Sequence, residues 1–184
     1  MPILAEPFVS LEDYLAWASH RPDAEQYEVV DGQPVMSPSP HGMHQLVLSR
    51  LSAALRDVCP AGHEVIQAPW DWLLWERPRL QIRQPDLLVV PRELLNYPRL
   101  LRAPLLAVEV LSAASLERDV VAKLRDYGRA GLDHYWVVDP DAPQIAVYGR
   151  RSDTLVLTTL VSGDEDLVIT EPLSVRLRPT GLVS

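Results

Sequence analysis

Two short, uninterrupted apolar runs constrain the fold of this chain more than any other feature. They are DLLVVP (86–91) and LLAVEVLS (105–112). Apolar runs of this length are typical of strands buried on both faces, which occur in sheets covered by helices on each side. A segment with helical periodicity (115–130) comes next, followed by a further strand-like segment, HYWVVDP (134–140). This order predicts a mixed α/β fold with a central sheet flanked by helices.

Additional helices and antiparallel hairpins are expected around this core. Ser10 before LEDYLAWA has the features of a helix N-cap, and HQLVLSRLSAALRDV (44–58) places its leucines on one helical face. Asp31-Gly32 between two strand-like segments is the signal of a type I′ hairpin. Extended structure is expected at 63–75, and hairpins at 144–161 and 167–177. No repeat, low-complexity tract or linker is found, so the length of 184 residues predicts one domain, 1–184.

Composition restricts the location and the kind of site. The chain is 47% hydrophobic and 23% charged, as a globular protein is. A single cysteine, Cys59, leaves no disulfide framework and no cysteine-rich zinc site. We find no signal peptide and no run of about 18 apolar residues, so we expect a soluble, cytoplasmic protein with no membrane contact. The net charge of −8 is unfavourable for nucleic-acid binding, although an acidic metal-binding cleft would contribute to it.

Lys123 is the only lysine among 17 basic residues. Arginine presents a rigid fork, whereas lysine is a compact point charge whose pKa moves readily when buried. At about 100° per residue, Lys123 lies at the border of a helical face formed by Val120, Leu124 and Tyr127. From there its side chain would reach a carboxylate over the sheet, and its removal should leave folding almost unchanged. The alternatives are a solvated lysine paired with Asp119, or chance survival in a lysine-poor composition.

Two carboxylates precede Lys123 within the apolar runs. Strand alternation places Glu109 on one face with Ala107 and Leu111, where an ionised carboxylate costs several kcal/mol unless it is compensated. A structural ion pair is the alternative for Glu109, and a turn or strand-start cap is the alternative for Asp86. Two acids and a lysine on core elements indicate metal-dependent phosphodiester chemistry. We therefore predict that the carboxyl groups of Asp86 and Glu109 converge within reach of one metal ion.

The other candidate residues are interpreted mainly as capping, surface or packing residues. Motifs for phosphate loops, dinucleotide binding, zinc proteases and serine hydrolases are absent. His41 and His44 stand three apart near a helix start, a spacing that could share a metal. They have no third partner in sight, and we interpret them as capping or surface residues. Nothing basic interleaves the tryptophans, which favours packing over base stacking: Trp70, Trp72 and Trp75. Three nearby arginines would form either a phosphate-binding surface or a solvated face: Arg77, Arg79 and Arg83.

Pro85-Asp86, Glu109 in an apolar strand and a helix soon afterwards resemble the PD-(D/E)xK restriction-endonuclease-like superfamily. The chain is most similar to a large bacterial family described as restriction endonucleases, mostly of unknown function. The resemblance covers nearly the whole chain, through YEVVDG (27–32), SPSPHGMHQLV (37–47), QPDLLVV (84–90), LLAVEVLS (105–112), RDVVAKLRDYGRAGLDHYWVVDP (118–140) and a C-terminal hairpin. Leu111 occupies the place of the superfamily's lysine. By resemblance, Lys123 on the following helix replaces it.

The resemblance implies a restriction-endonuclease-like core and a nuclease that uses Mg²⁺ or Mn²⁺ to hydrolyse phosphodiester bonds, with DNA as the expected substrate. It implies that Asp86 and Glu109 bind the metal, that Lys123 assists catalysis and that Glu28 completes the metal shell. Cleavage of both strands predicts a homodimer, with an exposed stretch from Trp70 to Trp75 as its contact surface. Two alternatives stay open: a nuclease fold that binds nucleic acid or protein without cleaving it, and a hydrolase of a small phosphorylated substrate.

Overall fold

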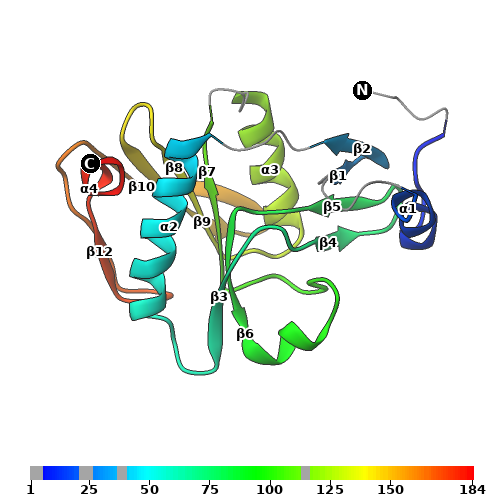
Figure 1. The fold of residues 1–184 in the computed structure, drawn as a ribbon, viewed down its shortest axis with the longest axis horizontal. Helices are drawn as coiled ribbons and strands as arrows, with labels where there is room; N and C mark the ends of the chain where they lie inside the picture. The colour runs from blue at the N-terminus through cyan, green and yellow to red at the C-terminus, as the bar shows by residue number, and fades with distance from the viewer. Residues whose placement is uncertain (1–5, 21–26, 37–40, 113–116) are drawn as a thin grey trace.

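The centre of the fold is a six-stranded sheet with strand order β10-β9-β8-β7-β6-β3 (Figure 1). The computed structural model describes residues 6–20, 27–36, 41–112 and 117–184. The strands are β3 (His63–Gln67), β6 (Leu87–Pro91), β7 (Leu106–Val110), β8 (His134–Asp139), β9 (Gln144–Arg151) and β10 (Thr154–Ser162). β7 and β8 are parallel and are connected through α3 (Glu117–Arg129), whereas the other neighbours pair antiparallel. The predicted mixed sheet is confirmed.

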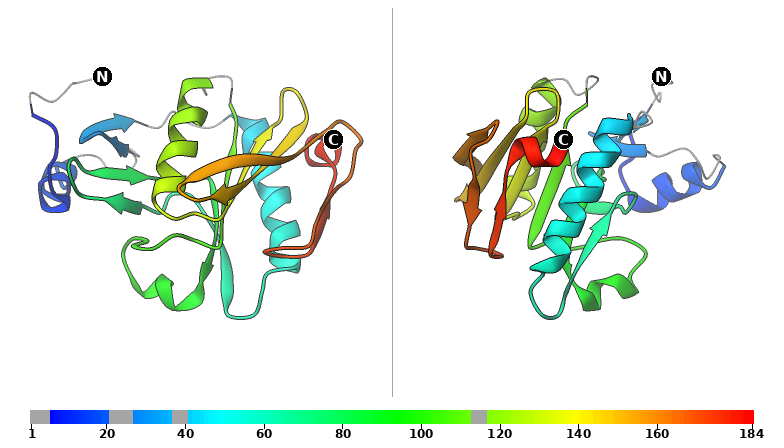
Figure 2. Two further views of the ribbon diagram at one scale, coloured as in Figure 1. Left: turned by 180° about the vertical axis from the view of Figure 1, so that it is seen from behind. Right: turned by 60° about the vertical axis from the view of Figure 1, so that its left-hand side comes forward.

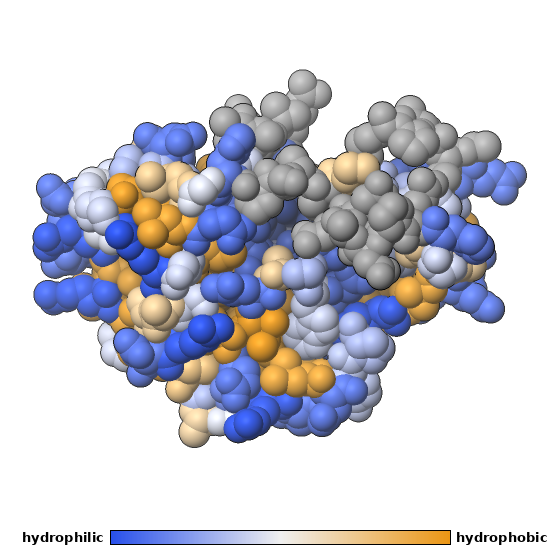
Figure 3. Space-filling view, in the orientation of Figure 1, coloured by the Kyte–Doolittle hydropathy of each residue, from blue (hydrophilic) through white to orange (hydrophobic). Residues whose placement is uncertain are grey.

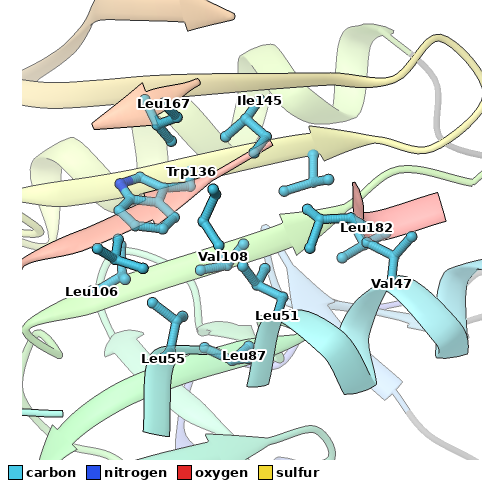
Figure 4. Packing of buried hydrophobic residues seen from close by; sticks show 14 of the residues in the cluster. Val47, Leu51, Leu55, Leu87, Leu106, Val108, Trp136, Ile145, Leu167 and Leu182 are labelled. Carbon is cyan, nitrogen blue, oxygen red and sulfur yellow. The ribbon is translucent and has the colours of Figure 1, made fainter. Parts of the chain in front are cut away.

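The sheet is buried on both faces, as the apolar runs predict. On one face, Val108 and its neighbours pack against α2 (Gly42–Asp57), as Figure 4 shows for Leu51 and Leu55. The same cluster includes residues of β11 (Leu167–Ile169), β12 (Val175–Leu177) and α4 (Pro179–Val183). On the other face, Ala107 packs with residues of α3, which lies in front of the sheet in the left view of Figure 2. The alternation predicted for β7 is therefore confirmed.

A second, four-stranded sheet lies beside the central one, with strand order β2-β1-β5-β4 (Figure 1). It consists of β1 (Tyr27–Val30), β2 (Gln33–Met36), β4 (Trp72–Trp75) and β5 (Gln81–Arg83), and its core includes residues of α1 (Leu11–Ala18). The β1–β2 turn has φ of +50° at Asp31 and +76° at Gly32, as a type I′ turn requires. The Ser10 side chain accepts a hydrogen bond from the Asp13 backbone N–H, which confirms the predicted N-cap.

The region around the tryptophans differs from one expectation. Trp72 is 1% exposed and stacks on Tyr127 with ring centroids 5.1 Å apart, while Trp70 and Trp75 are half-buried. The packing interpretation is confirmed for Trp72. Trp70 and Trp75 are less exposed than expected, and the use of this stretch as a contact surface stays a prediction. The predicted helix 115–130 begins at Glu117 in the described residues, and positions 115 and 116 lie outside them. A short 3₁₀ helix (Arg92–Asn96) follows β6.

Within the part of the chain that the structure describes, no helix is long and apolar enough to cross a membrane.

Candidate active site

Strand register brings Asp86 and Glu109 to the same edge of the central sheet. β6 and β7 are antiparallel, and Leu87 pairs with Val108. The next positions outward, Asp86 and Glu109, are therefore neighbours across the two strands. Asp86 Oδ2 accepts a 2.7 Å hydrogen bond from the backbone N–H of Val110, which fixes this carboxylate beside the end of β7.

Glu109 and Lys123 form a buried ion pair between β7 and α3. Lys123 Nζ lies 2.9 Å from Glu109 Oε2, and the two residues are 9% and 7% exposed. Tyr127, one turn further along α3, donates a 2.8 Å hydrogen bond from its hydroxyl to Glu109 Oε1. Each carboxylate oxygen thus has a partner, as the burial of a charged group requires. Helical periodicity placed Tyr127 on the face that Lys123 borders, but it gave no sign of this bond to the acid.

Lys123 contacts two further carboxylates. Its Nζ lies 3.6 Å from Glu28 Oε1 of β1 and 3.6 Å from Asp119 Oδ2, one turn earlier on α3. The pair with Asp119, expected for a solvated lysine, is therefore only one of three contacts. Because the ammonium is buried among carboxylates, its removal would leave their charge uncompensated. The sequence predicted little change in folding on removal of Lys123, because it placed this residue at the border of a helix face. Lys123 is buried instead, so we now expect its removal to lower the stability of the fold.

His44 is a buried partner of Asp86. Its Nε2 lies 3.2 Å from Asp86 Oδ2, and the residue is 7% exposed in the first turn of α2. The hydrogen bond to Asp86 raises the pKa of His44, because the carboxylate stabilises the charged imidazolium. The interpretation of His44 as a capping or surface residue was therefore wrong. His41 is exposed at the N-cap position of α2, and its side chain makes no capping hydrogen bond.

Glu28 reaches the site from the second sheet through Arg83. Glu28 Oε2 accepts a 2.8 Å hydrogen bond from Arg83 Nη1, and its Oε1 accepts one of 3.1 Å from the backbone N–H of Gln84. Arg83 is 1% exposed and also donates to Asp126 Oδ2 at 2.8 Å. Arg83 is therefore an internal ion-pair partner, and its expected place in a basic surface was wrong. The other two arginines of that cluster are exposed.

Burial and neighbouring charges shift the pKa values of Glu109, Glu28 and Lys123 in different directions. Burial, with the charges of Asp86 and Glu28 added to it, raises the pKa of Glu109 to about 7, although Lys123 acts in the opposite direction. Burial alone would also raise the pKa of Glu28, but Lys123 and Arg83 bring it below its usual value. For Lys123, burial would lower the pKa, yet the carboxylates of Glu109, Glu28 and Asp119 raise it. Lys123 is therefore a permanent cation at neutral pH.

The site is rich in carboxylates. Carboxylates outnumber the lysine and the arginine of this cluster: Glu28, Glu109, Asp119 and Asp126 pair with Lys123 or Arg83, and Asp86 pairs with His44. Carboxylate oxygens are the ligands that Mg²⁺ and Mn²⁺ prefer. Among the described residues, no group of three His, Cys, Asp or Glu side chains is arranged to hold a metal. In this arrangement the Lys123 ammonium contacts both Glu28 and Glu109, so that metal binding at these acids stays a prediction.

A pocket opens on the His44 side of Asp86. It has a volume of about 220 Å³ and is lined by the start of α2 and by the segments that follow β7 and β8: His41, Met43, His44, Leu111, Ser112, Pro140 and Asp141. These walls are largely apolar and include neither lysine nor arginine. The pocket therefore suits an uncharged part of a ligand better than a phosphate.

Sequence reasoning identified the carboxylates and the lysine but missed the residues that hold them: His44, Arg83, Asp126 and Tyr127. For Asp126 a signal was present, since it lies three residues after Lys123 and shares a helical face with it. For Arg83 no local signal distinguishes a buried guanidinium from a solvated one, because the partners that bury it lie far away in sequence.

Comparison with known proteins agrees with this fold. A crystal structure described as "a putative nuclease belonging to DUF820 from Anabaena variabilis" is similar in fold, with a TM-score of 0.73 at 18% identity over 95% of this chain and 97% of that one. No curated protein matches the sequence. The family model described as "Putative restriction endonuclease" matches residues 11–179, nearly the whole chain, and the protein therefore belongs to this family, Uma2.

Proposed function

We propose that this protein is a metal-dependent nuclease that hydrolyses phosphodiester bonds, with DNA as its substrate. The observation that carries the proposal is the buried Glu109–Lys123 pair beside Asp86. Asp86, Glu109 and Lys123 come from different parts of the chain and meet at one end of the β6 and β7 strands. Burying charged groups there costs stability. Such costs are typical of sites kept for chemistry.

The carboxylates of Asp86 and Glu109, with Glu28 beside them, would hold Mg²⁺ or Mn²⁺ through oxygen ligands. When bound, such an ion supplies positive charge for the scissile phosphate and lowers the pKa of a water molecule. Tyr127 orients Glu109 through its hydrogen bond to Oε1, and His44 orients Asp86. Both acids are thereby held for ligation before substrate arrives.

Lys123 would stabilise the charge that develops on the phosphate, or orient the attacking water. Its ammonium carries three donors and stays charged, because three carboxylates surround it. A guanidinium is wider, and its donors lie in a fixed plane. We therefore expect both Lys123→Arg and Lys123→Ala to lose about 10²–10³ in rate, the usual loss when one transition-state donor is removed.

Two sites are needed to cut both strands of a duplex, and we propose that a homodimer supplies them. The stretch from Trp70 to Trp75, in which Trp70 and Trp75 are half-buried, stays the candidate contact surface. On the face seen in Figure 3, apolar residues form small groups between hydrophilic ones, which fits an interface of mixed polarity.

The alternative of a non-catalytic module is less favoured, because a fold without activity has no reason to keep its buried charges. The alternative of a small phosphorylated substrate is supported by the pocket of about 220 Å³ beside His44, whose walls suit the uncharged part of such a substrate, with its phosphate at the carboxylate site.

The test is cleavage of plasmid DNA, single-stranded oligonucleotides and nucleotides, with Mg²⁺, Mn²⁺ or a chelator. Asp86→Asn and Glu109→Gln should abolish metal-dependent cleavage. Asp133→Asn is the matched control, because it removes an acid from an exposed ion pair with Arg150. Cleavage that survives in both site variants would refute the proposal. Hydrolysis of nucleotides alone would favour the small substrate, and Mn²⁺ binding without cleavage of any substrate would favour the binding module.

A further inference from the structure

Lys123 lies on α3 and its partner Glu109 lies on β7, so their contact depends on the orientation of α3 against the sheet. A rotation of α3 by one residue is about 100°, which would carry the ammonium away from Glu109. Some contact must therefore fix the rotation of α3. The residues that face inward from this helix show which one.

Asp119, Lys123, Asp126 and Tyr127 lie within about 100° of one another around α3. All four make polar contacts toward the site, and Asp126 is the least exposed of the charged residues among them, at 1%. Its Oδ2 accepts hydrogen bonds from Gln81 Nε2 at 2.7 Å and from Arg83 Nη2 at 2.8 Å. Both donors belong to β5, so Asp126 fastens α3 to the second sheet.

Arg83 makes the complementary connection. While Nη2 binds Asp126 on α3, Nη1 binds Glu28 on β1 at 2.8 Å. One buried guanidinium therefore joins two elements that each carry a side chain touching Lys123. A lysine at position 83 would have to serve both carboxylates from a single nitrogen, whereas the planar fork of arginine presents a separate donor to each in a fixed direction.

We propose that Arg83 and Asp126 are positioning residues. In this proposal, the buried Arg83–Asp126 pair locks the rotation of α3 against the second sheet and thereby holds the Lys123 ammonium between Glu109 and Glu28. The consequence for catalysis rests on the proposed function, whereas the placement of Lys123 does not.

Other contacts keep α3 on the sheet when this pair is cut. Tyr127 is fully buried, stacks on Trp72 and binds Glu109. Gly128 lies against the turn between β9 and β10, where an added Cβ would come within 2.8 Å of the Asp153 carbonyl oxygen. Variants of the Arg83–Asp126 pair should therefore fold, with the lysine displaced.

The sequence offers a direct probe, because Lys123 is the only lysine. Lysine labelled with ¹³C and ¹⁵N gives a single ammonium signal by NMR, and that signal reports the surroundings of Nζ. In the wild type we expect slow exchange of the ammonium protons with water, as burial and three carboxylates dictate. Asp126→Asn keeps a carbonyl oxygen for Gln81 but removes the charge that binds Arg83. It should shift the signal and speed its exchange at least tenfold.

Arg83→Lys is the second variant, which keeps the charge but replaces the two separate donors of the guanidinium by a single nitrogen. The matched controls are Asp133→Asn and Arg150→Lys, which make the same changes in an exposed pair. Asp133 directly precedes the first residue of β8, whereas Glu109 pairs with Val137 near the other end of that strand. They should leave the signal unchanged. Melting temperatures confirm that each variant is folded, and the signal is compared only in folded protein.

If the wild type cleaves DNA, Asp126→Asn should lower kcat by roughly 10–100-fold with little change in KM, the usual effect of residues that orient a catalytic group. In a Lys123→Ala background the same substitution should have no further effect, because the residue acts only through that lysine. An unchanged ammonium signal in both folded variants would overturn the proposal. A wild type that cleaves nothing would refute the proposed function, and the NMR comparison would still decide the positioning role.

Discussion

Replacing Lys123 by alanine should destabilise the fold strongly. Its Nζ lies 2.9 Å from Glu109 and 3.6 Å from both Glu28 and Asp119, on a side chain that is 11% exposed. Removing one partner of a buried ion pair leaves the other charge uncompensated, at a cost of about 3–5 kcal/mol. Arg83 still neutralises Glu28, so the uncompensated charge falls on Glu109.

The cost should depend on pH, because Glu109 can retain a proton instead. Its pKa is about 7 with Lys123 present, and loss of the ammonium raises it further. A carboxyl whose folded pKa exceeds the unfolded one stabilises the fold at low pH. This contribution falls by about 1.4 kcal/mol per pH unit until the pH reaches the folded pKa. In the wild type this stabilising contribution of Glu109 stops falling near pH 7. In Lys123→Ala, where the pKa of Glu109 is higher, it keeps falling above pH 7. The cost of the substitution should therefore be about 1 kcal/mol larger at pH 8 than at pH 7.

Urea unfolding, monitored by tryptophan fluorescence at pH 6, 7 and 8 with a chelator present, measures the difference in the free energy of unfolding between the wild type and Lys123→Ala. Lys123→Arg should recover much of the stability, since it returns a cation to the site. Arg150→Ala is the control: it breaks an exposed pair worth about 0–1 kcal/mol and should show no trend with pH. A cost for Lys123→Ala below about 1 kcal/mol, or one equal at all three pH values, would refute this account of the buried cluster.

Three further outcomes are expected. Mn²⁺ affinity, measured by calorimetry, should rise roughly fivefold between pH 6 and 7, because Glu109 must lose its proton to bind. Glu109→Gln should abolish that rise, and its persistence would assign the proton elsewhere. Met43→Ala, in the pocket wall, should raise KM for oligonucleotides roughly fivefold, because it removes about 1 kcal/mol of apolar contact. Leu46→Ala, at a comparably exposed position of the same helix outside the pocket, should leave KM unchanged. Equal KM values for the two variants would exclude the pocket from substrate binding. Gly128→Ala should cost roughly 1–3 kcal/mol in thermal unfolding, because its Cβ would lie 2.8 Å from a backbone carbonyl oxygen, while Gly42→Ala, in open space, should be neutral.

Local patterns in the sequence determined the elements and their faces. The runs that became β6 and β7 are buried on both sides, and burial of this kind requires apolar side chains at nearly every position. Asp31-Gly32 predicted its turn because only certain residues accept positive φ at both central positions. Glu109 was recognisable as a candidate because an acid in such a strand breaks the pattern. Each of these signals lies within a few residues, so it can be read without knowledge of the fold.

The contacts between distant residues were decided by the tertiary structure alone. Glu28 and Arg83, like Arg83 and Asp126, pair across more than 40 positions, and such pairs leave no periodicity in the sequence. A buried arginine and an exposed one look alike in sequence, as do a histidine that caps a helix and one that binds an acid. Whether Trp72 faced solvent or the core depended on where α3 packed. The sequence by itself determined which residues have the chemistry for a site, because chemical type is a property of each residue. Which of them meet, and what holds them, depended on the packing of α3 and the second sheet against the edge of β7.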